Sequence, residues 1–290
     1  VYTPRHCVRA ADLEVAHGCA GKYTHGLRMR ESSTCDEDED VASMAMSAVR
    51  RLLDKRGVRR RDVGMLMVGS ESLIDRSKSL KSRVMAVLAD KEARADERLF
   101  LAADAAAADA DADVDDDEEE DDACADVEGV DTYHACYGGT AALLACSNWA
   151  ESRAWDGRWA IAVCTDVSDA PAQYAFMNGA AAVAVLVGPR APLVMQTPRV
   201  SCVLDEWDFY KPVGWPSMGP IIDGPHSKQV YYDCLVRCQR RMRAKAGYTF
   251  AEDNAALVFH LGGGPTFVRH AFEEAAHAAR TGATRATRDA

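Results

Sequence analysis

The chain has 290 residues, enough for one large hydrophobic core or two smaller ones. Its formal net charge of −11 has a local origin, because twelve Asp or Glu residues and no basic residue lie between Asp104 and Asp122. The rest of the chain is nearly neutral and has no broad basic and aromatic pattern, so nucleic-acid binding has no support. No apolar run approaches the ~20 residues that span a membrane, so a membrane role is not expected.

The first part of the chain predicts a helix followed by a buried strand. Residues Val41–Leu53 have apolar side chains at helical spacing and end in a basic turn before Gly57. The acidic run at residues 36–40 suits the N-terminus of this helix electrostatically. Val63–Gly69 is a short apolar run that ends in glycine, which predicts a strand leading directly to Glu71.

The periodicity then stops. Residues from about 91 to 126 are mainly Ala, Asp and Glu, a composition that buries too little apolar surface to offset its ordering entropy. We therefore expect a mobile insertion. A calcium site is not expected, because the run lacks the glycine turn and spaced ligands of a dedicated loop.

After Val130 the chain alternates again between strand and helix patterns. The strands are expected at Trp159–Cys164, Ala180–Val187 and Ala255–His260, and the helices at Ala141–Ala150, Val230–Ala246 and Thr266–Ala279. Residues 200–230 are rich in Trp, Tyr, Pro and Gly, which indicates an irregular segment. The alternation predicts an α/β protein.

Cys136 stands where an extended segment gives way to a helix, with Tyr137, two glycines and Thr140 behind it. A helix N-terminus favours negative charge, so this setting is expected to lower the pKa of the thiol. The glycines would let a ligand carbonyl approach backbone N–H groups that can receive an oxyanion. Each of the ten cysteines could instead be a small buried hydrophobe, and this is our interpretation of the other nine.

The segment from Gly129 to Ala142, which contains Cys136, resembles the nucleophile motif of eukaryotic 3-hydroxy-3-methylglutaryl-CoA synthases. Further segments resemble that family in the family's order: Gly21–Thr24, Gly69–Lys81, Asn148–Trp149, Trp155–Arg158, Asp208–Pro212, Ile222–Gly224 and Val258–His260. The resemblance implies a thiolase-like fold of layered αβαβα type. The chain would hold an N-terminal half at residues 1–195, interrupted by the acidic insertion, and the start of the C-terminal half at residues 196–290.

The resemblance also implies the reaction, in which acetyl-CoA, acetoacetyl-CoA and water give hydroxymethylglutaryl-CoA and CoA without a further cofactor. Cys136 would carry the acetyl group, Glu71 would deprotonate its methyl group, and His260 would hold and polarise the acetoacetyl group. For Glu71 the alternative is a solvated loop acid, and for His260 a histidine of the core. Matched substrate-binding positions are Ala20, Lys22, Asp75, Asp166, Asn178, Asp208, Ser227 and Arg269.

The chain departs from the family pattern after Leu27, after Asp166 and after His260. After His260 the family has Ser-Pro and then a lysine that meets CoA, whereas this chain reads Leu261 and three glycines before Pro265, so Arg269 is the nearest basic substitute. After Asp166, an asparagine and a threonine of the family are replaced by Tyr174 and Asn178. Family members are also much longer.

Two alternatives to this synthase remain open. One is a related condensing enzyme that uses another acyl-CoA, and the other is a non-catalytic thiolase-like module that binds CoA.

Analogy with thiolase-fold proteins predicts a homodimer. A cytoplasmic location is expected, with the mitochondrion as the alternative if a targeting segment precedes residue 1. Cys234 and Cys238 lie four apart on an expected helix, but no paired ligands stand near them, so zinc is not expected.

Overall fold

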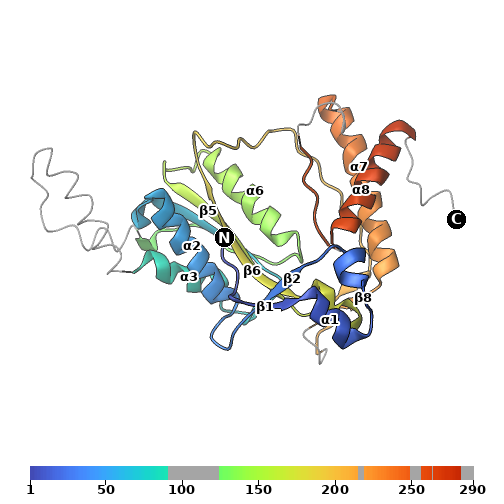
Figure 1. The fold of residues 1–290 in the computed structure, drawn as a ribbon. Helices are drawn as coiled ribbons and strands as arrows, with labels where there is room; N and C mark the ends of the chain where they lie inside the picture. The colour runs from blue at the N-terminus through green and yellow to red at the C-terminus, as the bar shows by residue number, and fades with distance from the viewer. Residues whose placement is uncertain (91–123, 215–218, 249–255, 263, 282–290) are drawn as a thin grey trace, which may run out of the picture. The chain divides into compact units, whose positions relative to one another are not determined.

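The computed structural model describes residues 1–90, 124–214, 219–248, 256–262 and 264–281 (Figure 1). The chain packs as two units that are interleaved along the sequence. Unit 1 comprises Val1–His6, Ser33–Val167 and Ala180–Val194, and unit 2 comprises Cys7–Ser32, Ser168–Gly179 and Met195–Ala290. The sequence predicts that an N-terminal half of the fold ends at residue 195 and that a C-terminal half begins at residue 196. The two units do not test this boundary, which stays a prediction.

Unit 1 is built on a four-stranded sheet with the order β4-β3-β5-β6. Its strands are β3 (Val63–Gly69), β4 (Asp131–Thr132), β5 (Trp159–Ser168) and β6 (Gly179–Val187). β3 pairs in parallel with both β4 and β5, so the carboxyl ends of these three strands lie at one edge of the sheet. The expected strands at residues 63–69, 159–164 and 180–187 are confirmed.

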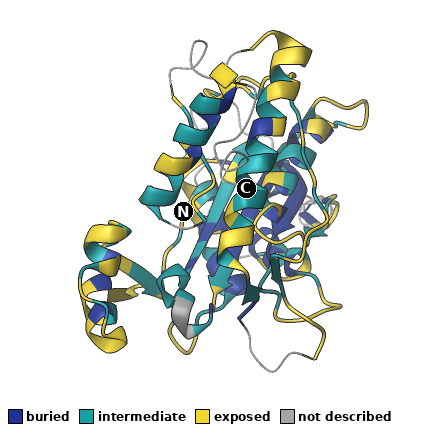
Figure 2. Ribbon diagram, turned by 90° about the vertical axis from the view of Figure 1, so that its right-hand side faces the viewer, coloured by how far each residue is buried: buried dark blue, intermediate teal, exposed yellow. Residues whose placement is uncertain are grey.

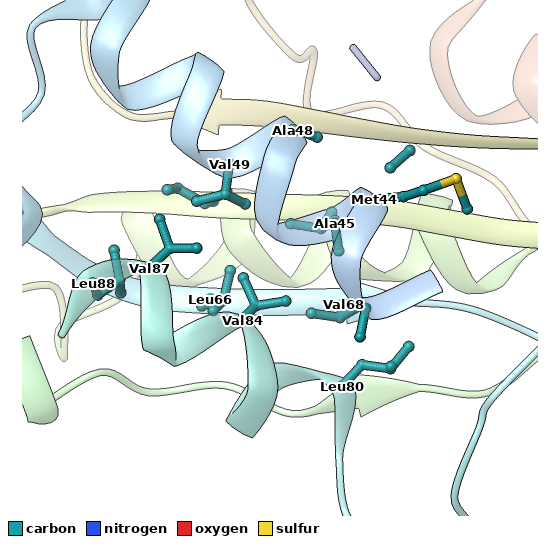
Figure 3. Packing of buried hydrophobic residues seen from close by; sticks show 14 of the residues in the cluster. Met44, Ala45, Ala48, Val49, Leu66, Val68, Leu80, Val84, Val87 and Leu88 are labelled. Carbon is teal, nitrogen blue, oxygen red and sulfur yellow. The ribbon is translucent and has the colours of Figure 1, made fainter. Parts of the chain in front are cut away.

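Helices cover both faces of this sheet (Figure 1). α2 (Val41–Arg56) and α3 (Leu80–Leu88) pack on one face, where Leu66 and Val68 of β3 point (Figure 3). α6 (Gly138–Ala150) packs on the other face against Met65 and Met67. Every residue of β3 is buried, because a central parallel strand has helices on both sides.

The N-terminus of α2 is capped by Asp40, the last residue of the acidic run. The side chain of Asp40 accepts a hydrogen bond from the N–H of Ser43, and the hydroxyl of Ser43 accepts one from the N–H of Asp40. This reciprocal box satisfies two N–H groups that the helix itself cannot pair. At the other end, Gly57 takes the left-handed conformation that closes the helix.

The elements of unit 2 are mostly short. They are α1 (Ala10–His17), the π-helical turn η1 (Lys22–Gly26), the 3₁₀ turn η3 (Ala172–Met177), β7 (Phe209–Tyr210), β8 (Ile221–Ile222), α7 (Gly224–Ala246) and α8 (Pro265–Thr281). β1 (His6–Arg9) and β2 (Glu31–Thr34) pair with each other and carry the chain between the units. α7 and α8 pack on each other but bury few residues (Figure 2). In unit 1, the 3₁₀ turn η2 (Arg60–Asp62) directly precedes β3.

The expected strand at Ala255–His260 is wrong for the residues that the structure describes. Residues 256–262 belong to no strand or helix, and Val258 is 97% exposed. An apolar run forms a strand only when a neighbouring strand satisfies its backbone groups. No strand of the described residues pairs with this segment.

Most of the expected acidic insertion lies outside the described residues, which resume at residue 124. Its last residues depart from the expectation of a mobile segment. Cys124 is only 2% exposed, and the N–H of Val127 bonds to the carbonyl of Ala125. Within the described residues, no helix is both long enough and apolar enough to cross a membrane.

Candidate active site

The site in unit 1 forms where the end of β3 meets the start of α6. A Cβ atom added to Gly69 would lie 2.4 Å from the carbonyl carbon of Gly138, and one added to Gly139 would lie 2.3 Å from Sγ of Cys164. Glycine is therefore required so that the helix can approach the sheet. The glycines thus have a packing role, and the expectation that they also let a ligand approach the backbone N–H groups stays a prediction.

Cys136 lies in a tight turn two residues before α6 begins. The N–H groups of Tyr137 and Gly138 bond to the carbonyls of His134 and Ala135, at 3.0 and 3.1 Å. Ala135 has a φ of 41°, in the left-handed region that a residue with a Cβ rarely adopts. Such a residue costs about 1–3 kcal/mol, so the surrounding structure holds this turn against local strain. The turn leaves Cys136 exposed.

Glu71 follows β3 by two residues and faces this cysteine. The thiol of Cys136 donates a hydrogen bond to Oε1 of Glu71 across 3.4 Å. The two residues are 65 positions apart in sequence, and the parallel pairing of β3 and β4 brings their segments to the same edge of the sheet. A carboxylate at this distance can take a proton from the sulfur or from a group bound to it.

Asp166, on β5, holds the backbone that carries Glu71. Its Oδ1 accepts hydrogen bonds from the N–H of Glu71 at 2.8 Å and from the N–H of Ser72 at 3.1 Å. The hydroxyls of Ser70 and Ser72 donate to the same oxygen, at 3.1 and 2.6 Å. The hydroxyl of Ser72 in turn accepts from the N–H of Val167. Asp166 therefore fixes the backbone position of Glu71, and its expected part in substrate binding stays a prediction.

The pKa of the Cys136 thiol is raised to about 12, so the expectation of a lowered pKa is wrong. Burial of the sulfur among protein atoms contributes most, although part of the residue reaches solvent, and the carboxylates of Glu71 and Asp166 add to it. A helix N-terminus stabilises a nearby anion by only about 0.3–1 kcal/mol. Two carboxylates and a partly desolvated sulfur outweigh that contribution.

Asp75, also in unit 1, shapes its own loop. Its Oδ1 accepts hydrogen bonds from the N–H groups of Ser77 and Lys78, at 2.7 and 2.6 Å, and these bonds lower the pKa of its carboxyl group. The side chain is exposed. These contacts assign Asp75 a local structural role, and its expected support of the active site stays a prediction.

In unit 2, Ala20 and Lys22 stand at the turn η1, and both are exposed. The ammonium group of Lys22 lies 5.9 Å from the centroid of the Tyr23 ring. The turn is held by Glu14, whose carboxylate accepts from the N–H groups of Gly21, Tyr23 and Thr24 at 2.6–2.9 Å. These hydrogen bonds, of which those from Thr24 contribute most, lower the pKa of the Glu14 carboxyl group to about 2. Burial acts in the opposite direction and raises that pKa. Sequence reasoning missed Glu14, because nothing in its helix marks a residue that reaches seven to ten positions ahead.

The other positions that the sequence predicts to bind substrate in this part of the chain, Asn178, Asp208, Ser227 and Arg269, also lie in unit 2. Oδ1 of Asn178 accepts from the N–H of Ala170 at 2.5 Å, and the carbonyl of Asp208 accepts from the N–H of Asp223 at 2.8 Å. Ser227 is in the first turn of α7, which Asp223 caps. Arg269, on α8, is exposed and lies 3.9 Å from Glu273.

His260 belongs to the extended segment of unit 2. Its ring centroid lies 6.5 Å from that of Tyr231, which packs against Phe267 at 4.8 Å. The residue is exposed, which does not fit the alternative of a core histidine. The structure thus brings Cys136, Glu71 and Asp166 together in unit 1, whereas His260 is part of unit 2. In the described parts of the chain, no three His, Cys, Asp or Glu residues gather to hold a metal ion.

The sheet with helices on both faces places the chain in the thiolase-like fold class. Solved structures of that class share the fold: a curacin-pathway HMG synthase in complex with apo donor-ACP matches 99% of this chain and 62% of its own, with a TM-score of 0.76 and 21% identity. The structure described as MvaS in complex with 3-hydroxy-3-methylglutaryl coenzyme A matches 87% of this chain and 54% of its own, with a TM-score of 0.69 and 31% identity.

Sequence comparison identifies the family within that class. The family description "Hydroxymethylglutaryl-coenzyme A synthase N terminal" matches residues 1–102 and 115–192, and the chain belongs to this family. Hydroxymethylglutaryl-CoA synthase erg13A of Aspergillus fumigatus is 38% identical over 248 residues, which are 84% of this chain and 46% of the relative. The mitochondrial hydroxymethylglutaryl-CoA synthase of Homo sapiens is 37% identical over 84% of this chain and 42% of its own length. The chain thus spans about half the length of the curated relatives it matches.

Proposed function

We propose that the chain supplies the nucleophile and the base of a hydroxymethylglutaryl-CoA synthase, which condenses acetyl-CoA with acetoacetyl-CoA to give HMG-CoA and CoA. The 3.4 Å contact between Sγ of Cys136 and Oε1 of Glu71, in a chain of this family, is the observation that carries the proposal. The substrates are CoA thioesters, and no further cofactor takes part.

The first step transfers an acetyl group to Cys136. The thiol is protonated at neutral pH, because its pKa is about 12, and it needs a base before it attacks. The Glu71 carboxylate, the acceptor of the thiol's hydrogen bond, takes that proton. The sulfur then forms a bond to the acetyl carbonyl carbon, the carbon–sulfur bond to CoA breaks, and the CoA thiolate recovers a proton from Glu71.

The second step forms the carbon–carbon bond. Glu71, now ionised again, removes a proton from the methyl group of the acetyl thioester, and the resulting carbanion attacks the ketone carbon of acetoacetyl-CoA. His260 holds and polarises the acetoacetyl group, and its part rests on the family resemblance. The proton that Glu71 took from the methyl group passes to the alkoxide that forms. Water then hydrolyses the thioester, which releases the carboxylate of HMG-CoA and returns the thiol of Cys136.

The test is acetyl-enzyme formation with radiolabelled acetyl-CoA. The 290-residue chain should retain acid-stable label on the tryptic peptide that contains Cys136, and Cys136→Ser should lose it. Cys7→Ser removes another exposed thiol and should leave the label unchanged. Label that persists in Cys136→Ser at another residue would overturn the assignment of the nucleophile.

A second candidate function is CoA binding without turnover, which is favoured by the departures from the family pattern after Asp166 and after His260. Titration calorimetry with CoA separates the two: binding without acetyl-enzyme supports the second candidate. Acetyl-enzyme that condenses with a different acyl-CoA, seen by product analysis, would instead indicate a related condensing enzyme.

The oligomeric state and the cellular location are proposed by analogy with the family. We propose a homodimer, which sedimentation velocity tests directly. A cytoplasmic location is proposed, and the mitochondrial relatives make the mitochondrion the alternative. Imaging of the tagged full-length product distinguishes them.

A further inference from the structure

A connecting segment of unit 2 lies along the C-terminal part of α7. The guanidinium group of Arg241 donates to the carbonyl of Ser201, and Nζ of Lys245 donates to the carbonyl of Arg199 at 2.8 Å. As the connection advances from residue 199 to residue 201, its partner on the helix moves back by about one turn. The segment therefore runs antiparallel to the helix.

A hollow of about 600 Å³ lies at the surface between this segment and the helix. Such a volume falls within the roughly 300–1,000 Å³ that is typical of small-molecule sites. Both segments belong to unit 2, so the hollow is a feature of that unit alone. Its lining residues are Arg199, Val200, Ser201, Arg241, Ala244 and Lys245.

The charge of both segments is entirely positive. No Asp or Glu occurs at residues 189–204 or 234–248, whereas α7 has five basic residues after Cys234. Three basic residues, Arg199, Arg241 and Lys245, line the hollow itself. The C-terminus of a helix carries about half a negative charge, which can account for one nearby cation but not for three. The hollow is therefore electrostatically complementary to an anion with more than one charge.

The bonds to the main chain leave donors for such a ligand. A guanidinium group has five N–H donors and an ammonium group has three, and the carbonyls of Ser201 and Arg199 each accept from one of these groups. Because these bonds already hold the side chains of Arg241 and Lys245, less side-chain entropy is lost when a ligand binds. The two residues are one helical turn apart and face the same hollow, so they can contact two linked anionic groups at once.

We propose that this hollow binds the diphosphate group of a small molecule. The planar guanidinium group of Arg241 can donate two parallel hydrogen bonds to one phosphate group, while Lys245 supplies a compact charge to the other. Nucleotides and CoA both carry a diphosphate, and the experiment below separates these two sources. The site itself does not depend on the proposed function, because pyrophosphate alone is enough to test it.

Titration calorimetry of the 290-residue chain with pyrophosphate is that test. We expect pyrophosphate to bind about tenfold more tightly than sulfate, and to bind more weakly as sodium chloride rises from about 20 mM to about 200 mM. Ala244→Glu places a carboxylate in the hollow without removing Arg241 or Lys245, and it should weaken binding about tenfold. Ala244→Gln has the same size without the charge and should bind pyrophosphate more tightly than Ala244→Glu.

A second pair of variants tests the position of the charge. Arg241→Gln should weaken pyrophosphate binding about tenfold, whereas Arg240→Gln removes the same charge from a residue that does not line the hollow and should change binding less than about twofold. Equal losses in both variants would show general attraction by a basic helix and overturn the site. Absence of pyrophosphate binding, equally tight sulfate binding, or tighter binding of poly-glutamate would overturn it as well.

The source of the diphosphate follows from acetyl-enzyme formation at Cys136. If CoA thioesters occupy the hollow, Ala244→Glu should raise the acetyl-CoA concentration that gives half-maximal labelling. If a nucleotide occupies it, ADP should bind as pyrophosphate does, and labelling should be the same in Ala244→Glu and Ala244→Gln. A chain that binds pyrophosphate at this site but forms no acetyl-enzyme would contradict the proposed function and leave the diphosphate site in place.

Discussion

At Cys136, the surroundings of one sulfur atom set its protonation. The helix that begins two residues later favours the thiolate, while desolvation and the carboxylates of Glu71 and Asp166 favour the thiol. Desolvation and the two carboxylates outweigh the helix, and the pKa of the thiol reaches about 12. The resting cysteine is therefore a hydrogen-bond donor, which suits a site where the same glutamate must act as base in two successive steps.

Removing the charge at Glu71 should make Cys136 more acidic while disabling the proposed reaction. A carboxylate beside a thiolate destabilises it, so Glu71→Gln should lower the thiol pKa and raise the rate of alkylation by iodoacetamide at pH 8 about tenfold. Mass spectrometry of the Cys136 peptide measures the rate. Asp156→Asn neutralises a carboxylate that pairs with Arg158 and should leave the rate unchanged. Slower alkylation in Glu71→Gln would contradict the electrostatic account.

Glu14 predicts a pH dependence of stability. Its pKa is about 2 in the folded chain and 4.5 for an ordinary glutamate, so the stability it contributes is fully present above about pH 4.5 and is lost as the pH falls toward 2. Glu14→Gln removes the charge that accepts the three N–H bonds of the turn. Its urea midpoint should lie below that of the unchanged chain at pH 7, with a smaller gap at pH 3. An equal gap at both values would indicate that shape, not charge, holds the turn.

Single residues differ in how far their sequence predicts their role. The position of Glu71 just past an apolar run was sufficient to place it at the edge of the sheet, where it meets Cys136. The direction of the cysteine's pKa was not predictable, because it depends first on burial of the sulfur and then on Glu71 and Asp166, which the fold brings to it. A helix terminus is visible in a sequence, but the carboxylates that tertiary structure brings to it are not.

At the scale of elements, prediction succeeded where a pattern is local. Val63–Gly69 was bounded by its own apolar run, and the helix expected at 266–279 extends over Pro265–Thr281. The helix expected from Val230 begins at Gly224, because Asp223 caps it and Pro225 fits its first turn. The strand expected at 255–260 failed, because its neighbours are not a property of its own residues.

The junction of β3 and α6 tolerates no side chain at its glycines. Gly139→Ala would bring a methyl group to 2.3 Å from Sγ of Cys164, which overpacks the helix against β5 and should cost about 1–3 kcal/mol in urea unfolding. Cys164→Ala in the same chain removes the nearest atom and should recover part of the loss. Gly26→Ala is the control, since its Cβ would meet no atom closer than 3.7 Å. Equal costs at Gly139 and Gly26 would mean that intrinsic glycine effects, not packing, dominate.

At the scale of the whole molecule, burial is unevenly distributed between the units. Unit 1 has a sheet covered on both faces, with all seven residues of β3 buried. In unit 2, the 23-residue helix α7 has a single buried residue, Val236. The chain also spans about half the length of its curated relatives. The proposed chemistry needs groups from both units, so the stability of each unit affects how much of that chemistry this chain can perform.

Native-state hydrogen exchange should reveal this difference. The amides of Leu66 and Val68 on β3 donate to carbonyls of Glu128 and Val130 inside the covered sheet, so they should exchange only when unit 1 opens. Residues 256–262 lie in no strand or helix and should exchange about a thousandfold faster or more. Exchange followed by pepsin digestion and mass spectrometry compares the two segments in one sample, with α8 as an internal helical reference. Comparable protection of 256–262 and β3 would mean that the segment carrying His260 is paired in solution, and that the expected strand forms there after all.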